Sequence, residues 1–132
     1  MRLFVALQPS AEALQELAEA TGALRRAHPA LRWTRPEQWH VTLTFLGEVA
    51  EQQLPALTER LSGVAGQYAP LSLALTGGGR FGQQVLWVGV AGDLVPLERL
   101  ARSVSEVARN AGIPVADRPY RPHVTLARAR RP

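Results

Sequence analysis

Cysteine and lysine are both absent from this chain of 132 residues. Without cysteine there is no disulfide framework, no thiolate nucleophile and no cysteine-based zinc site. All 15 basic residues are therefore arginine, and the formal net charge is +4. This bias is typical either of a general compositional preference or of a protein that attracts polyanions, because guanidinium groups hold phosphate through paired hydrogen bonds.

Long apolar runs are also missing, since none approaches the ~18 residues that a membrane-spanning helix needs. The opening stretch MRLFVALQPS is interrupted by Pro9 and Glu12 too early for a secretory signal. With 46% hydrophobic and 20% charged residues, the composition is that of a globular protein. We therefore expect one compact domain over residues 1–132, a cytoplasmic location, a monomer and no contact with membranes.

Arginine is unevenly distributed, and this favours the functional interpretation of the bias. A cluster near the end of the chain comprises Arg118, Arg121, Arg128, Arg130 and Arg131. Such a cluster is typical of phosphate or nucleic-acid binding.

Hydrophobic periodicity predicts an alternation of strands and helices. Strands are expected at 2–7, 40–46, 71–77, 84–90 and in the final stretch RPHVTLARAR, and helices at about 10–27, 51–66 and 93–111. Ser10 and Asp93 are placed to cap the first and third helices. The glycine-rich segment GGGRFGQ predicts the turn of a hairpin and lacks the lysine of a phosphate-binding P-loop.

The tetrapeptide HVTL occurs at 40–43 and again at 123–126, an offset of 83 residues. The same offset aligns a strand, a helix cap (Ser10 with Asp93), a helix face and an Arg-Pro step. We therefore predict an α+β fold of two duplicated strand–helix–strand units. If each unit is a right-handed crossover, the copies are related by a pseudo-twofold axis. The lobes then enclose a central cleft, with antiparallel-containing sheets and helices outside.

Alternation along a strand places His40 and Thr42 on one face, and His123 and Thr125 on one face of the second copy. Two imidazoles suit metal-free chemistry at a phosphodiester, one as base towards water and one as acid towards the leaving oxygen. The two hydroxyls can donate to phosphate oxygens that gain charge in the transition state. A single such histidine is more often an ordinary surface residue, and the repetition is what favours a site.

A metal site is the competing interpretation of the two histidines. Two ligands are too few without nearby carboxylates or cysteines, and neither strand carries one. We expect neither a metal nor another cofactor.

Arg128 is a candidate phosphate ligand, although strict alternation places it opposite to His123. It reaches the site only if the strand bends or ends near Ala127, and its repeat equivalent, Phe45, is expected in the core.

His28 is expected to be an exposed residue at a helix end. Trp39 and Tyr120, in the turns before the two histidine strands, are candidates for stacking on a nucleobase, while Trp87 is expected to be buried.

The pair HVTLTFLG and PHVTLAR, preceded by MRLFVAL and with LWVGV between them, resembles the 2H phosphoesterase superfamily over nearly the whole chain. Its most similar members are the bacterial and archaeal RNA 2′,3′-cyclic phosphodiesterases, also called 2′-5′ RNA ligases. The resemblance implies hydrolysis of a terminal 2′,3′-cyclic phosphate on RNA to a 2′-phosphate in a bilobal fold. It implies catalytic positions at His40, Thr42, His123 and Thr125, and a phosphate-binding arginine at Arg128.

Several points stay open at the level of sequence. Members of the superfamily usually continue past the second motif with further strands, which we expect to be absent here. Reversed chemistry, 2′-5′ ligation of RNA, would use the same two histidines. A non-catalytic RNA-binding module would use the arginines and the turn aromatics instead. We assign His123 as base and His40 as acid, an assignment that reverses if the substrate docks the other way round.

Overall fold

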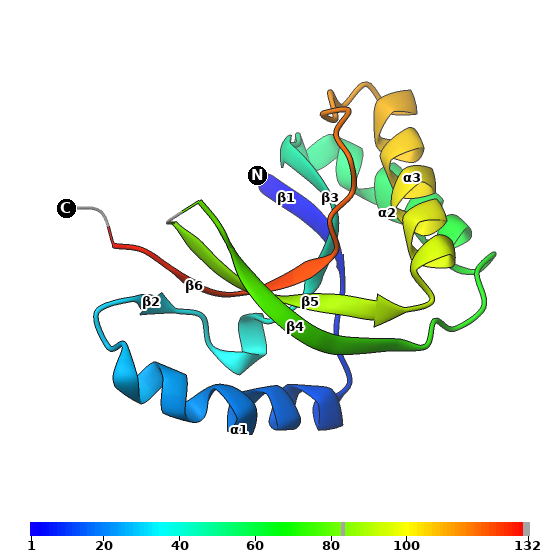
Figure 1. Cartoon of the computed structure of the whole chain (residues 1–132). Coiled ribbons are helices and arrows are strands. Elements are labelled where there is room, and N and C mark those ends of the chain that lie inside the picture. Colours follow the sequence, from blue (N-terminus) through cyan, green and yellow to red (C-terminus); the bar gives the residue numbers. More distant parts are fainter. Residues whose placement is uncertain (83, 131–132) are drawn as a thin grey trace. The chain divides into compact units, whose positions relative to one another are not determined.

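The computed structural model describes residues 1–82 and 84–130. Its elements are β1 (Arg2–Leu7), α1 (Ala11–Ala27), β2 (Arg32–Trp33), β3 (Val41–Glu48), α2 (Leu54–Ala65), β4 (Leu73–Phe81), β5 (Val85–Gly92), α3 (Leu94–Asn110) and β6 (His123–Arg128) (Figure 1). Short 3-10 helices at Pro36–Gln38 and Glu51–Gln53 precede β3 and α2. Helices alternate with strands, and β6 pairs antiparallel with both β2 and β5, so the predicted α+β class is confirmed.

The chain forms two compact units that interleave along the sequence. The first unit contains residues 1–6, 42–73 and 92–121, and the second contains the described residues within 7–41, 74–91 and 122–132. Each unit has its own apolar core. None of the described helices is long and apolar enough to cross a membrane.

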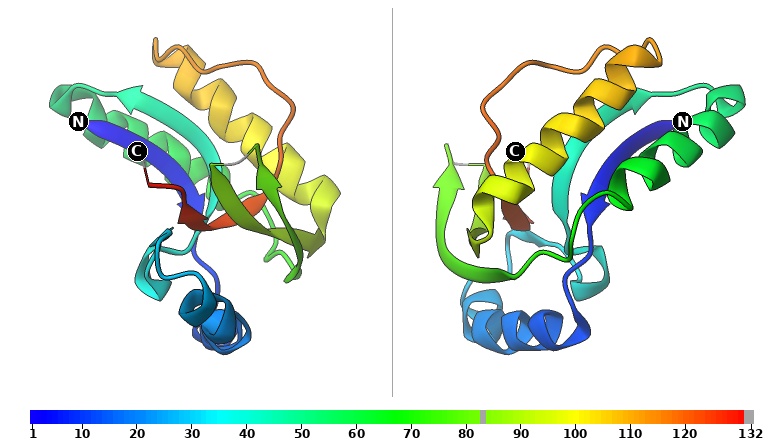
Figure 2. Two further views of the ribbon diagram at one scale, coloured as in Figure 1. Left: turned by 60° about the vertical axis from the view of Figure 1, so that its left-hand side comes forward. Right: turned by 90° about the vertical axis from the view of Figure 1, so that its right-hand side faces the viewer.

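The first unit is built on a two-stranded sheet of β1 and β3, with α2 and α3 packed beside it (Figure 2). Its core joins Leu46 of β3, Leu57 of α2 and Ala108 of α3. The buried residues of α3 are Leu97, Leu100, Ala101, Val104 and Ala108. This spacing matches one stripe of a helix.

The second unit is built on a four-stranded sheet in the order β2-β6-β5-β4, with α1 along one face (Figure 1). Leu17 of α1 packs against Val88 of β5 and against Val124 and Leu126 of β6. Ser10 caps α1 as predicted, because its hydroxyl accepts a hydrogen bond of 3.2 Å from the Ala13 amide.

The crossover suggested by the internal repeat is wrong. β5 and β6, the strands of the second copy, are antiparallel neighbours, whereas a crossover connects parallel strands. Each helix of the repeat packs on strands of the other copy. α1, from the first copy, packs on β5 and β6 of the second copy, and α3, from the second copy, packs on β1 and β3 of the first. The repeat is therefore real in local structure, and its pseudo-twofold arrangement stays a prediction.

Two local expectations also need correction. Phe45 is 71% exposed and pairs with the ring of Phe4 at 6.4 Å, so it is not a core residue. The core side of β3 changes along the strand: Val41 and Leu43 are buried, and then Thr44 and Leu46. Strict alternation from Val41 therefore fails, because the two ends of β3 serve different cores.

Asp93 stands at the N-cap position of α3 without capping it, because its carboxylate accepts instead from the Ser72 amide at 2.8 Å. The predicted hairpin forms between β4 and β5, but the three glycines lie inside β4 rather than in the turn. A Cβ on Gly79 would lie 2.7 Å from Cζ2 of Trp87. The glycine run therefore makes room for an indole, and sequence reasoning had no signal for that contact.

Candidate active site

The second motif lies on β6, between β2 and β5. His123 pairs with Gly89 and Thr125 with Trp87, and directly paired residues share one face of a sheet. Val124 and Leu126 point to the other face, where they are buried against α1. We call the side that carries His123 and Thr125 the histidine face. The strand register therefore confirms the prediction that His123 and Thr125 lie on one face of the sheet.

Two aromatic rings define the surroundings of His123, which is half-buried. The Phe81 ring meets the imidazole edge-on at a centroid distance of 4.9 Å, and the Trp87 ring lies 6.3 Å away. Phe81 and Trp87 stack on each other at 5.2 Å. Trp87 thus packs beside the histidine rather than in the α1 core. Contact with these two rings restricts the rotation of the imidazole.

Arg128 returns to the histidine face because β6 contains a bulge. Trp87 pairs with Thr125 but the preceding Leu86 pairs with Ala127, which leaves Leu126 as an extra residue. Leu126 and Ala127 are consequently both buried, at 5% and 1% exposure. Arg128 then pairs with Val85, which shares the face of Trp87. The prediction that Arg128 lies opposite to His123 is wrong, because strict alternation does not survive a bulge.

Thr34 supports the bulge, and no sequence signal singled it out. Its amide donates to the Leu126 carbonyl at 2.9 Å. Its hydroxyl lies 2.9 Å from the Thr125 carbonyl and 2.8 Å from that of Leu126, and accepts from Nε1 of Trp39 at 2.8 Å. A β-branched residue beside a strand is ordinary in sequence. Only the tertiary contacts show that this hydroxyl forms hydrogen bonds with β6 and with Trp39.

His40 of the first motif is half-buried and lies just before β3. Its Nδ1 is 2.7 Å from the carbonyl oxygen of Gln38. A carbonyl can only accept, so Nδ1 carries the hydrogen, and in the neutral ring the lone pair is on Nε2. The short 3-10 helix that ends at Gln38 therefore sets the tautomer of the first histidine.

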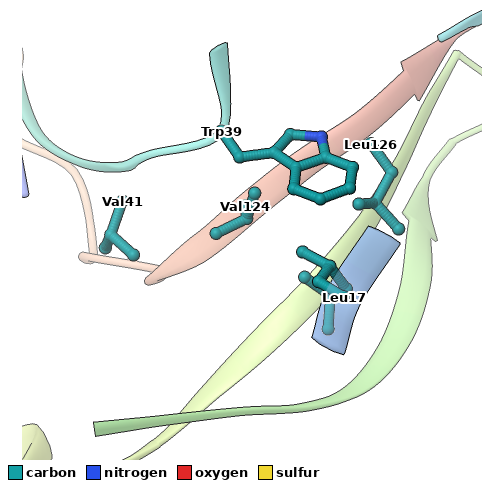
Figure 3. Packing of buried hydrophobic residues seen from close by; sticks show 6 residues of the cluster. Leu17, Trp39, Val41, Val124 and Leu126 are labelled. Carbon is teal, nitrogen blue, oxygen red and sulfur yellow. The ribbon is translucent and has the colours of Figure 1, made fainter. Parts of the chain in front are cut away.

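Trp39 anchors the residue before His40, and it cannot serve as a stacking platform. Its side chain is 1% exposed, and its indole lies among Leu17, Val124 and Leu126 (Figure 3). The Arg25 guanidinium lies 5.1 Å from the centre of its ring. The prediction that Trp39 stacks on a base is wrong, because both faces of its indole are covered by other residues.

Tyr120 and Thr42 belong to the first unit and are joined by a hydrogen bond. The phenol donates to the Thr42 carbonyl at 2.8 Å, and burial raises the pKa of Tyr120 to about 12. The Tyr120 phenol thus ties the loop before β6 to the strand of the first motif. Thr42 is half-buried, and its hydroxyl role and the stacking role of Tyr120 stay predictions.

The remaining predicted residues are at the surface. His28 ends α1 and is exposed, as predicted. Of the arginine cluster, Arg118, Arg121, Arg128 and Arg130 are exposed, and Arg131 lies outside the described residues. Within residues 1–82 and 84–130, no group of three or more histidine, cysteine or acidic side chains is placed to hold a metal ion.

Comparison with protein families gives a match over residues 7–87 to the family described as LigT like Phosphoesterase. The RNA 2′,3′-cyclic phosphodiesterase of Archaeoglobus fulgidus is 34% identical over 135 residues, covering 99% of this chain and 74% of that protein. The protein of the same name from Geobacillus stearothermophilus is 36% identical over 129 residues, covering 95% of this chain. That match spans only 41% of the Geobacillus protein, so the chain covers well under two thirds of this relative.

Solved structures of similar proteins also match this fold. A Thermus thermophilus protein matches with a TM-score of 0.78 at 30% identity, covering 100% of this chain and 76% of that one. The LigT protein of Escherichia coli in its apo form matches with a TM-score of 0.73 at 30% identity, covering 96% and 71%. The same E. coli protein complexed with 3′-AMP matches with a TM-score of 0.70 at 28% identity, covering 96% and 70%.

Proposed function

Because the chain belongs to the LigT-like phosphoesterase family, we propose that it hydrolyses the 2′,3′-cyclic phosphate at an RNA end to a 2′-phosphate. The observation that carries this proposal is the strand register of β6. It sets an imidazole, a hydroxyl and a guanidinium on one face, at His123, Thr125 and Arg128. These groups supply a proton carrier, a hydrogen-bond donor and a cation, which are what cleavage of a phosphodiester needs.

The reaction requires one bond to phosphorus to form and another to break. His123 takes a proton from a water molecule as the water oxygen attacks phosphorus. The bond from phosphorus to O3′ breaks, and protonated His40 gives its proton to O3′. The products are a 2′-phosphomonoester and a free 3′-hydroxyl. Each proton transfer contributes about 10²–10⁴ in rate.

The remaining groups bind the phosphate as its charge grows. Thr125 donates its hydroxyl hydrogen to a non-bridging oxygen, and the Arg128 fork holds the anion. Thr42 is the matching hydroxyl of the first motif, and its part is inferred from that motif alone. No metal takes part in this scheme. We place the activity in a cytoplasmic monomer that acts on RNA ends or nucleotides with a cyclic phosphate.

Product analysis tests this proposal. The chain is incubated with 2′,3′-cyclic AMP and EDTA, and phosphorus NMR identifies the product. We expect 2′-AMP, formed at the same rate with and without the chelator. Formation of 3′-AMP would contradict the direction of opening, and loss of activity with EDTA would contradict the metal-free scheme. A second reaction, with a cyclic-phosphate end and a 5′-hydroxyl end, shows whether 2′-5′ ligation occurs. RNA binding without turnover would favour a binding module.

A further inference from the structure

The turn that precedes the first motif is closed by the side chain of Gln38. This residue is the third and last of the 3-10 helix Pro36–Gln38. The Arg35 amide donates to Oε1 of Gln38 at 3.0 Å, and the Gln38 amide donates to the Arg35 carbonyl at 2.8 Å. A glutamine at the third helical position often reaches back in this way to the residue before the helix. Two hydrogen bonds therefore close the turn, and one of them depends on the glutamine side chain.

The turn also orients the peptide group that faces His40. That group joins Gln38 to Trp39. Its N–H donates to the Pro36 carbonyl at 3.1 Å, and its carbonyl oxygen lies 2.7 Å from Nδ1 of His40. Because a 3-10 turn has few hydrogen bonds of poor geometry, it needs the bond from the Gln38 side chain to stay closed. The direction of the carbonyl towards His40 therefore depends on that side chain.

The second motif lacks this arrangement. With the offset of 83 residues, the equivalent of Gln38 is Arg121, and residues 119–121 form no helix. A guanidinium group only donates hydrogen bonds, so the Arg121 side chain cannot accept from a backbone amide as Gln38 does. The closed turn thus belongs to the first histidine, although the two motifs are identical from the histidine to the leucine.

We propose that Gln38 is a positioning residue for His40 and that its side chain determines which imidazole nitrogen meets the substrate. The inference rests on the proposed function, in which His40 gives a proton to O3′. While the Gln38 carbonyl holds the hydrogen on Nδ1, the proton that is transferred comes from Nε2. After the transfer, the neutral ring is left in the tautomer that the carbonyl stabilises. If the turn opens, the carbonyl leaves Nδ1, and fewer molecules present Nε2 to the substrate.

The test replaces Gln38 by side chains of similar length with and without a strong acceptor. Gln38→Met has only a weak acceptor, whereas Gln38→Glu keeps an oxygen that accepts from the Arg35 amide. The control is Gln53→Met. Gln53 is the third residue of the other 3-10 helix, Glu51–Gln53, and its Oε1 accepts from the Ala50 amide at 3.4 Å. This second turn leads into α2 rather than into a histidine strand.

Each variant is measured by nitrogen-15 spectra of the neutral His40 ring and by hydrolysis of 2′,3′-cyclic AMP. We expect Gln38→Met to give a mixture of tautomers and to lower kcat about tenfold, with KM within about twofold. Gln38→Glu should restore the wild-type tautomer and most of kcat. Gln53→Met should lower the urea midpoint of unfolding and leave the His40 tautomer and kcat unchanged.

Three results would overturn the role of Gln38. The first is a wild-type tautomer and kcat in Gln38→Met. The second is an equal loss of kcat in Gln53→Met, which would make the effect one of general stability. The third is a Gln38→Glu variant that behaves like Gln38→Met, because the acceptor would then be irrelevant. If the wild type does not hydrolyse 2′,3′-cyclic AMP, the proposed function fails, and the tautomer in Gln38→Met still decides whether Gln38 positions the ring.

Discussion

The indole nitrogen of Trp39 donates a hydrogen bond of 2.8 Å to the hydroxyl of Thr34. The same hydroxyl lies 2.9 Å from the carbonyl of Thr125. One side chain thus links the residue that precedes His40 to the strand that carries His123. Both motif histidines belong to the second unit, and this link fixes the backbone beside each of them.

Replacing Thr34 tests this link. Thr34→Val keeps the shape and removes the hydroxyl, so the buried indole N–H loses its acceptor, at a cost of about 1–3 kcal/mol in the free energy of unfolding. We expect kcat to fall more than KM rises, because the motif backbones lose their support. Thr34→Ser, which restores the hydroxyl, should recover both quantities. A valine variant with wild-type kcat and unfolding free energy would contradict the role.

The tautomer of His40 can be observed directly. Its Nδ1 faces the Gln38 carbonyl at 2.7 Å, so the neutral ring carries its hydrogen on Nδ1. We expect nitrogen-15 spectra of the imidazole, recorded at a pH where the ring is neutral, to show a protonated Nδ1 and an unprotonated Nε2. The His40→Ala variant assigns the signals. A ring with its hydrogen on Nε2 would contradict the geometry.

The phenol of Tyr120 predicts an alkaline limit to stability. Burial raises its pKa from 10.0 to about 12 in the folded chain. Below pH 10 the phenol is protonated in both the folded and the unfolded chain, so its full contribution to the free energy of unfolding is present. Between pH 10 and 12 the unfolded chain loses this proton first, and the free energy of unfolding falls. In a Tyr68→Phe background, tyrosinate absorbance reports Tyr120 alone. A titration midpoint near 10 would contradict the burial.

Two neighbours on β3 provide a matched stability test. Phe45 is 71% exposed, whereas Leu46 is 5% exposed and packs in the first core. We expect Phe45→Ala to change the free energy of unfolding by less than about 1 kcal/mol, and Leu46→Ala to cost about 2–5 kcal/mol. Urea denaturation measures both. Equal losses would mean that β3 presents a different face to the core.

Sequence periodicity predicted the helices and most strands because their apolar stripes face a core. Leu97, Leu100 and Val104, for example, repeat at helical spacing and are buried. Strand faces were harder to predict, because alternation holds only until a bulge or a change of core. The bulge at Leu126 moved Arg128 to the histidine face, and the change of core along β3 exposed Phe45.

The candidate site was predicted in part. The repeated His-x-Thr pattern located the histidines, since repetition is visible in sequence. The burial of a particular tryptophan cannot be read from sequence in the same way. Trp39 has the sequence context of an exposed aromatic residue in a turn, and yet it is buried. The hydrogen bonds of Thr34 and the edge contact of Phe81 with His123 depend on residues far apart in the chain. No local pattern encodes such contacts.

The central claim is that His40 and His123 form an acid–base pair at a cyclic phosphate. The most direct measurement is kcat for 2′,3′-cyclic AMP hydrolysis by His40→Ala, His123→Ala and, as a control, the exposed His28→Ala. We expect kcat to fall about 10²–10⁴-fold in each of the first two variants and to be unchanged in the third. Wild-type turnover that persists at full rate in both His40→Ala and His123→Ala would contradict the claim.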